Sequence, residues 1–206
     1  MSYNSLRRRH EEGVYPKVYR LPLHKYNSTR NLEPPWEQLP GKFYMTKEQA
    51  ALLLDPGLKY IREKMNGSTH SFRMKHYLVH YENVRKRRVI PYTNLPSYQF
   101  VFAVENTVTG KKLNVQETIE LCVEYNWYMP HIITITKAPL SIEELVSIAR
   151  RPSHYNPEHM PEGILIINEN IEMEGKIVNP EYDDNKQPGI YQDLEYYACL
   201  EDNYLG

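Results

Sequence analysis

The stretch REKMNGSTHSF, residues 62–72, marks a change of pattern in the middle of the chain. The residues that lead into it, LKYIREKM at 58–65, alternate well enough to predict a β-strand. Lys64 then stands three residues before Gly67, where the backbone can turn without a side chain in the way. A lysine in this position is usually a residue at a strand end before a turn, but it can also be a nucleophile. The rest of the sequence has to distinguish the two.

Helices and strands alternate irregularly along the chain. Three capping-box patterns, Thr46 with Gln49, Asn114 with Glu117 and Ser141 with Glu144, predict helices at 46–54, 115–127 and 142–151. Strands are predicted at 58–65, 77–84, 98–107, 131–136, 162–168 and 175–179. This order predicts an α+β fold with two antiparallel-rich sheets and flanking helices.

The length of 206 residues suits one domain with additional arms. Residues 1–40 carry five prolines and no periodicity, which predicts an extended arm that packs on the domain or on a protein partner. We expect the domain itself at 41–185 and an acidic tail at 186–206.

Several classes of protein are disfavoured. The two cysteines, Cys122 and Cys199, do not form the pattern of a disulfide scaffold, and the histidines show no zinc-ligand spacing with them. No apolar run approaches the roughly 20 residues that span a bilayer, and no signal peptide is visible. We therefore expect an intracellular, soluble protein.

Charge is unevenly distributed, although the net charge is only -1. Residues 59–88 contain nine Lys or Arg and two Glu, whereas residues 162–206 contain two Lys and eleven acidic residues. The basic part is suited to phosphates, and the acidic part could hold them only through a metal ion. A lysine can attack phosphorus only as the neutral amine, which nearby cations such as Arg62 and the run at 85–88 favour.

The succession of motifs from residue 43 to 182 resembles the ATP-dependent RNA ligases, a family of covalent nucleotidyltransferases. Their first motif is a lysine, any residue, an aspartate or substitute, and a glycine, which EKMNGST at 63–69 fits. The resemblance implies a nucleotidyltransferase-like cleft in which Lys64 becomes adenylylated and Asn66 and Gly67 contact the nucleotide.

The later motifs of that family have counterparts in this chain. The ring-stacking aromatic residue maps to Phe100 or Phe102, and a glutamate that contacts the metal or ribose maps to Glu162 before Gly163. The late lysine that contacts the phosphate maps to Lys176. Two features depart from the family: Val178 replaces a second lysine, and no Gly-Glu pair lies between Lys64 and Phe102.

Each of these residues also has a structural interpretation. Phe100 and Phe102 could be core residues. Glu162 could be no more than the residue at which a strand begins, and Lys64 could be a structural lysine. The basic run of Arg85, Lys86, Arg87 and Arg88 could be a solvated face, or it could bind nucleic acid.

The resemblance implies an ATP-dependent enzyme that forms a lysyl-AMP intermediate with Mg²⁺ and joins or adenylylates nucleic-acid ends, RNA rather than DNA. Glu162 would be the metal contact. The alternative is a catalytically inactive, ligase-like structural or binding subunit of a larger nucleoprotein or viral assembly. Lys64, Glu162 and Lys176 favour the enzyme, and the proline-rich arm and acidic tail favour the subunit.

Overall fold

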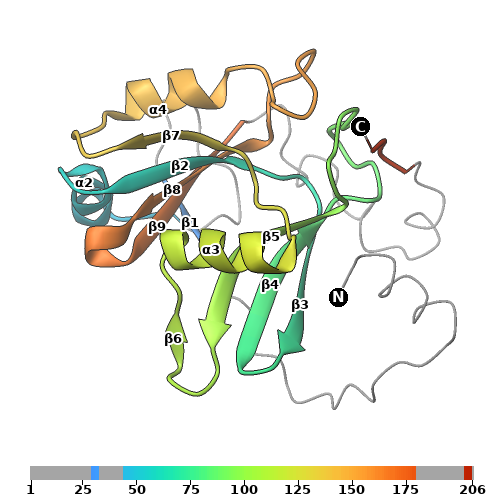
Figure 1. Ribbon diagram of the computed structural model, residues 1–206. Coiled ribbons are helices and arrows are strands. Elements are labelled where there is room, and N and C mark those ends of the chain that lie inside the picture. Colours follow the sequence, from blue (N-terminus) through green and yellow to red (C-terminus); the bar gives the residue numbers. More distant parts are fainter. Residues whose placement is uncertain (1–28, 33–43, 180–201, 206) are drawn as a thin grey trace, which may run out of the picture.

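Two β-sheets form the framework of the chain in a computed structural model that describes residues 29–32, 44–179 and 202–205 (Figure 1). Sheet A has the order β1-β9-β8-β2-β7 and is antiparallel except for the pair β1–β9. Its strands in that order are Arg30–Asn31, Met173–Val178, Gly163–Asn168, Lys59–Lys64 and Ile132–Thr136.

Sheet B is wholly antiparallel, with the order β3-β4-β5-β6. Its strands are Ser68–Met74, Tyr77–Asn83, Gln99–Asn106 and Lys111–Lys112. The α+β prediction with two antiparallel-rich sheets is therefore confirmed.

The three predicted helices are also confirmed, each with both hydrogen bonds of its capping box. They are α2 (Lys47–Leu54), α3 (Val115–Tyr125) and α4 (Ile142–Ala149). A 3₁₀ turn, η1 (Glu169–Ile171), joins β8 to β9. No helix in the described ranges is long and apolar enough to cross a membrane.

The helices cover different sheets. Side chains of α2 and α4, such as Leu53 and Leu145, pack on Ile61, Ile164 and Ile177 of sheet A, and all five are buried. Helix α3 packs on sheet B, and its first residue also reaches a cluster on the other face of sheet A. Because successive residues of a strand point to opposite faces, β2 has one face under α2 and α4 and one face toward sheet B.

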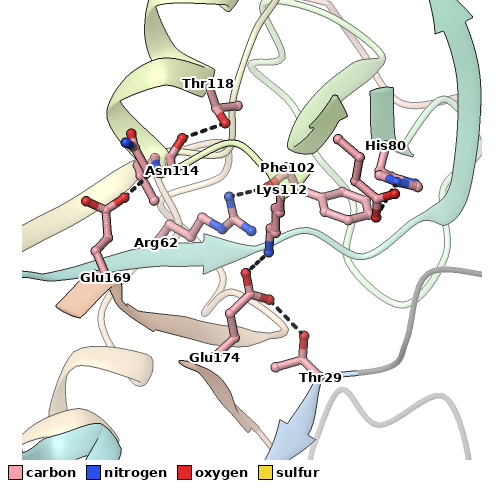
Figure 2. A network of polar contacts seen from close by, with 11 residues as sticks. Thr29, Arg62, His80, Phe102, Lys112, Asn114, Thr118, Glu169 and Glu174 are labelled. Atoms are coloured by element: carbon pink, nitrogen blue, oxygen red, sulfur yellow. Dashed lines mark hydrogen bonds and ion pairs between the residues drawn. The ribbon is translucent and has the colours of Figure 1, made fainter. Parts of the chain in front are cut away.

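Polar contacts join the two sheets (Figure 2). The guanidinium of Arg62 on β2 donates to the carbonyl of Phe102 on β5 at 2.9 Å. Lys112 on β6 forms an ion pair with Glu174 on β9, and Figure 2 shows Glu174 also facing Thr29. These contacts hold sheet B against the open face of sheet A.

Strands β1, β3 and β6 and the turn η1 were not expected from the sequence. Strand β3 is polar, with hydroxyl and charged side chains, because it is an edge strand whose side chains are mostly half-buried or exposed. Within the expected arm, Arg30–Asn31 pairs with β9, and the side chain of Leu32 is fully buried in the core of sheet A. The remainder of the arm and most of the expected acidic tail lie outside the described residues, so the predicted boundaries stay predictions.

Candidate functional site

The predicted lysine motif lies where the chain passes from one sheet to the other. Lys64 is the last residue of β2 in sheet A, and Ser68 is the first residue of β3 in sheet B. Lys64 is paired with Gly163, so Glu162 stands just beyond its partner on β8. The Nζ atom of Lys64 lies 2.5 Å from Oε2 of Glu162. The structure thus brings together two of the predicted site residues, 98 positions apart in the sequence.

Glu82 on β4 is a third charged residue at this junction. Burial, and then the charge of Glu162, raise the pKa of Glu82, whereas Lys64 and Arg88 act to lower it. Its carboxylate also accepts a hydrogen bond from Thr69 at 3.0 Å. Lys64 therefore lies in a field set by two carboxylates that also repel each other.

The sequence motifs did not single out Glu82, because no glycine precedes it and it forms no Gly-Glu pair. Its position becomes apparent only from the pairing of β4 with β5. Glu82 is directly opposite Phe100 on β5, and directly opposite residues of an antiparallel pair share a face. An acid beside the aromatic strand, on the face of the predicted ring-stacking residue, could have been proposed from that pairing.

Asn66 shapes the loop that follows Lys64. The side chain is buried, and its Oδ1 accepts the backbone N–H groups of Val89 and Ile90 at 3.1 and 3.4 Å. Its own backbone N–H donates to the hydroxyl of Tyr92 at 2.7 Å. The described contacts of Asn66 are therefore with the segment 89–92, and a contact with a nucleotide stays a prediction.

Gly67 is required by chain packing. A Cβ atom at this position would lie 2.4 Å from the carbonyl oxygen of Asn83 and 2.9 Å from a methyl group of Val84. We expected the glycine to make room for a nucleotide, whereas in the structure it makes room for the end of β4. Gly163 is similar, since its Cβ would lie 2.0 Å from the carbonyl oxygen of Ile177.

The opposite face of β2 is held by Glu63. Its buried carboxylate accepts the hydroxyl of Ser153 at 2.5 Å and the backbone N–H of His154 at 3.0 Å. Burial raises the pKa of Glu63, and these two hydrogen bonds act in the opposite direction. Tyr155, next in the chain, packs edge-on against Phe100 with ring centroids 5.1 Å apart.

The two candidate aromatic residues have different environments. Phe100 is fully buried in a cluster with Met65, Tyr92 and Tyr155, which agrees with its interpretation as a core residue. Phe102 is partly exposed, and its ring stacks on that of His80 at 6.2 Å. Of the two, Phe102 is the one whose side chain is accessible to solvent.

Lys176 lies on the same face of sheet A as Arg62, because both are opposite Leu165 of β8. Lys64 is two residues further along β2, so strand spacing and rise place the Cα atoms of Lys64 and Lys176 roughly 12 Å apart. Val178, which replaces the family's second lysine, is opposite Gly163 and so lies in the same row as Lys64. Of these two positions on β9, the one in line with Lys64 is therefore apolar.

The basic run divides in two. Arg88 acts on Glu82 and so belongs to the junction, whereas Arg85 and Lys86 form ion pairs with Asp202 near the end of the chain. Arg87 is exposed. Among the described residues, no group of three or more His, Cys, Asp or Glu side chains could hold a metal ion.

Comparison with known proteins finds similarity in structure and not in sequence. No protein-family model matches the chain, and no curated protein matches it. An RNA ligase of Naegleria gruberi with PPi is similar with a TM-score of 0.52 and 12% identity over 68% of this chain and 54% of that one. A variant of that ligase with ATP and Mn has a TM-score of 0.54 and 11% identity, over 69% and 55%.

A protein of Aquifex aeolicus assigned as an ATP-dependent DNA ligase is also similar, with a TM-score of 0.51 and 17% identity over 73% of this chain and 53% of that one. The chain spans about half the length of these structures. At this level of identity the likeness concerns the fold. The chain has the fold of a ligase nucleotidyltransferase domain.

Proposed function

We propose that this chain is an ATP-dependent, RNA ligase-like nucleotidyltransferase in which Lys64 is the residue that becomes adenylylated. The observation that carries the proposal is the junction of Lys64 with Glu162 and Glu82, within a fold similar to ligases. A carboxylate such as Glu82, whose pKa is raised by burial and by a second carboxylate, is typical of functional sites.

The first step is nucleophilic attack. Nζ of Lys64 forms a bond with the α-phosphorus of ATP, the bond from that phosphorus to the bridging oxygen breaks, and pyrophosphate leaves. The ammonium of Lys64 must first lose a proton to solvent. The carboxylate of Glu162, 2.5 Å from Nζ, favours the charged form, and a metal cation held by that carboxylate would offset this effect. Lys176 stabilises negative charge on the phosphates, and Phe102 supplies an aromatic face for the adenine.

A divalent metal fits the same junction. Mg²⁺ is commonly held by one or two carboxylates together with substrate phosphates, and Glu162 and Glu82 supply two carboxylates whose mutual repulsion a cation would relieve. When bound, the metal would offset the phosphate charge.

In the second step, the AMP passes from Lys64 to a 5′-phosphate at a nucleic-acid end, forming a new phosphoanhydride and releasing the lysine. The partner is RNA in preference to DNA, and Arg85, Lys86, Arg87 and Arg88 bind its backbone. Arg88 adjoins the junction, so a strand bound along this run leads toward Lys64.

A second function, that of an inactive ligase-like structural or binding subunit, is favoured by one observation. Val178 on β9 and Lys64 on β2 are both opposite Gly163 of β8, and the ATP-dependent RNA ligases carry a second lysine where this chain has Val178. The same experiment distinguishes the two functions.

The test is incubation of the full chain with ATP labelled at the α-phosphate, with Mg²⁺ or Mn²⁺, followed by a denaturing gel. We expect a labelled wild type, no label on Lys64→Ala or Lys64→Arg, and reduced label on Lys176→Ala. Lys137→Ala, which removes an exposed lysine after β7, is the matched control and should label like the wild type. A wild type without label would reject the enzyme and leave the inactive subunit.

A further inference from the structure

The last described residues, 202–205, are fixed to the segment that follows β4. Asn203 is buried, its backbone N–H donates to the carbonyl of Arg85 at 2.7 Å, and its side-chain amide donates to the carbonyl of Val84 at 2.6 Å. Its Oδ1 accepts the backbone N–H of Tyr92 at 2.9 Å. Asn203 therefore anchors the segment by polar contacts on three sides.

This anchor places Asp202 on the basic run. One carboxylate oxygen lies 3.1 Å from Nε of Arg85, and the other lies 2.7 Å from Nζ of Lys86. Hydrogen bonds from Lys86 and Arg85 lower the pKa of Asp202, so its carboxylate is ionised at neutral pH. Each carboxylate oxygen of Asp202 thus contacts one cation. The two non-bridging oxygens of a phosphodiester would contact Arg85 and Lys86 in the same way.

The ion pair between Arg85 and Asp202 adds little to holding the segment in place. The side chains of Arg85 and Asp202 are 61% and 37% exposed, and exposed ion pairs add little to stability. The hydrogen bonds of Asn203 already fix the backbone. What the carboxylate does change is the charge that Arg85 and Lys86 present to an incoming polyanion.

We propose that Asp202 is an internal competitor for the nucleic-acid backbone at Arg85 and Lys86, and that it weakens the binding of RNA to the basic run. This inference rests on the proposed function, since it assigns a regulator to the same nucleic-acid surface. An RNA strand that follows the basic run to the junction at Lys64 must displace Asp202 from Arg85 and Lys86, or share these two cations with it.

The experiment measures binding of a short, fluorescently labelled, 5′-phosphorylated single-stranded RNA to the full chain by anisotropy, over a range of salt concentrations. Asp202→Asn keeps the shape of the side chain and removes its charge. We expect it to tighten Kd at low salt by about three- to tenfold and to steepen the log–log salt dependence by about 0.7 for each additional phosphate that the basic run neutralises. The control is Glu143→Gln, which removes one exposed negative charge from α4 and should leave Kd within a factor of about 1.5.

Equal affinity of Asp202→Asn and Glu143→Gln, or no binding by either, would overturn the inference. Tightening that persists in a variant that also carries Arg85→Ala and Lys86→Ala would overturn it as well. Far-ultraviolet circular dichroism and a thermal melt check that Asp202→Asn is folded. The measurement needs no catalysis, so absence of the lysyl-AMP label would reject the proposed enzyme and leave this result unaffected.

Discussion

Glu63 and Lys64 are neighbours on β2, yet the two sides of the strand are built differently. The carboxylate of Glu63 is buried against neutral donors, the hydroxyl of Ser153 and the N–H of His154. The ammonium of Lys64 is partly exposed, and charged groups surround it, Glu162 at 2.5 Å and Glu82 beyond.

This difference distinguishes a structural contact at Glu63 from the candidate site at Lys64. Glu63 joins β2 to residues 153–154, so its loss should damage the fold. Around Lys64, burial and the charge of Glu162 raise the pKa of Glu82, while the charge of Lys64 acts to lower it. The Glu63 side holds the strand end in place, and under the proposed function the Lys64 side is the one that acts on a ligand.

The largest effect on stability should follow from Glu63→Ala. It leaves the buried hydroxyl of Ser153 and the part-buried N–H of His154 without their acceptor, so we expect a loss of about 2–4 kcal/mol in the free energy of unfolding, measured with urea. Lys64→Ala should lower that free energy by less, about 1–2 kcal/mol, because the ammonium is partly solvated although Glu162 beside it is buried. Equal losses in the two variants would remove the distinction between the two sides of β2.

Gly67→Ala should come next. The added methyl group meets the backbone of Asn83, and overpacking of this kind costs about 1–3 kcal/mol. Because the strain lies in the loop after Lys64, stability and labelling by ATP should fall together. A variant that is as stable as the wild type but takes no label would instead favour the expectation from the sequence, that the glycine makes room for the nucleotide.

The smallest effect concerns Glu82 and pH. Its folded-state pKa is raised above the ordinary value of 4.5, so the folded chain holds this proton more strongly than the unfolded chain. The carboxylate therefore costs stability as pH rises from about 4.5 through the folded-state pKa, and the cost is absent below that window. Unfolding of Glu82→Gln and the wild type at pH 4 and pH 7 should show the variant gaining relative stability at pH 7. A constant difference across that range would mean that Glu82 is not strained by burial and by Glu162.

The sequence predicted what depends on neighbours along the chain. Each capping pair lies within three residues, so Thr46, Asn114 and Ser141 marked the helix starts correctly. Alternating apolar residues predicted the inner strands. Strand β3 was missed because an edge strand needs no apolar face, and only its pairing with β4 makes it regular.

The site was predictable only as far as its motifs are local. Lys64 and Glu162 were proposed separately from short patterns, and their contact depends on the register of β2 with β8. Glu82 was missed because its place beside Phe100 depends on the register of β4 with β5, and because its interaction with Lys64 joins the two sheets. Asn203 was beyond reach, since its partner Tyr92 is 111 residues away and no local pattern links them.

The central claim, that Lys64 is the nucleophile, is tested most directly by locating the adduct. The wild type is incubated with ATP and Mg²⁺, digested, and mapped by mass spectrometry for peptides that carry AMP. The account predicts AMP on the peptide that contains Lys64, attached to that lysine, and no adduct in Lys64→Arg. An adduct on another residue such as Lys176, or no adduct on any peptide, would contradict it.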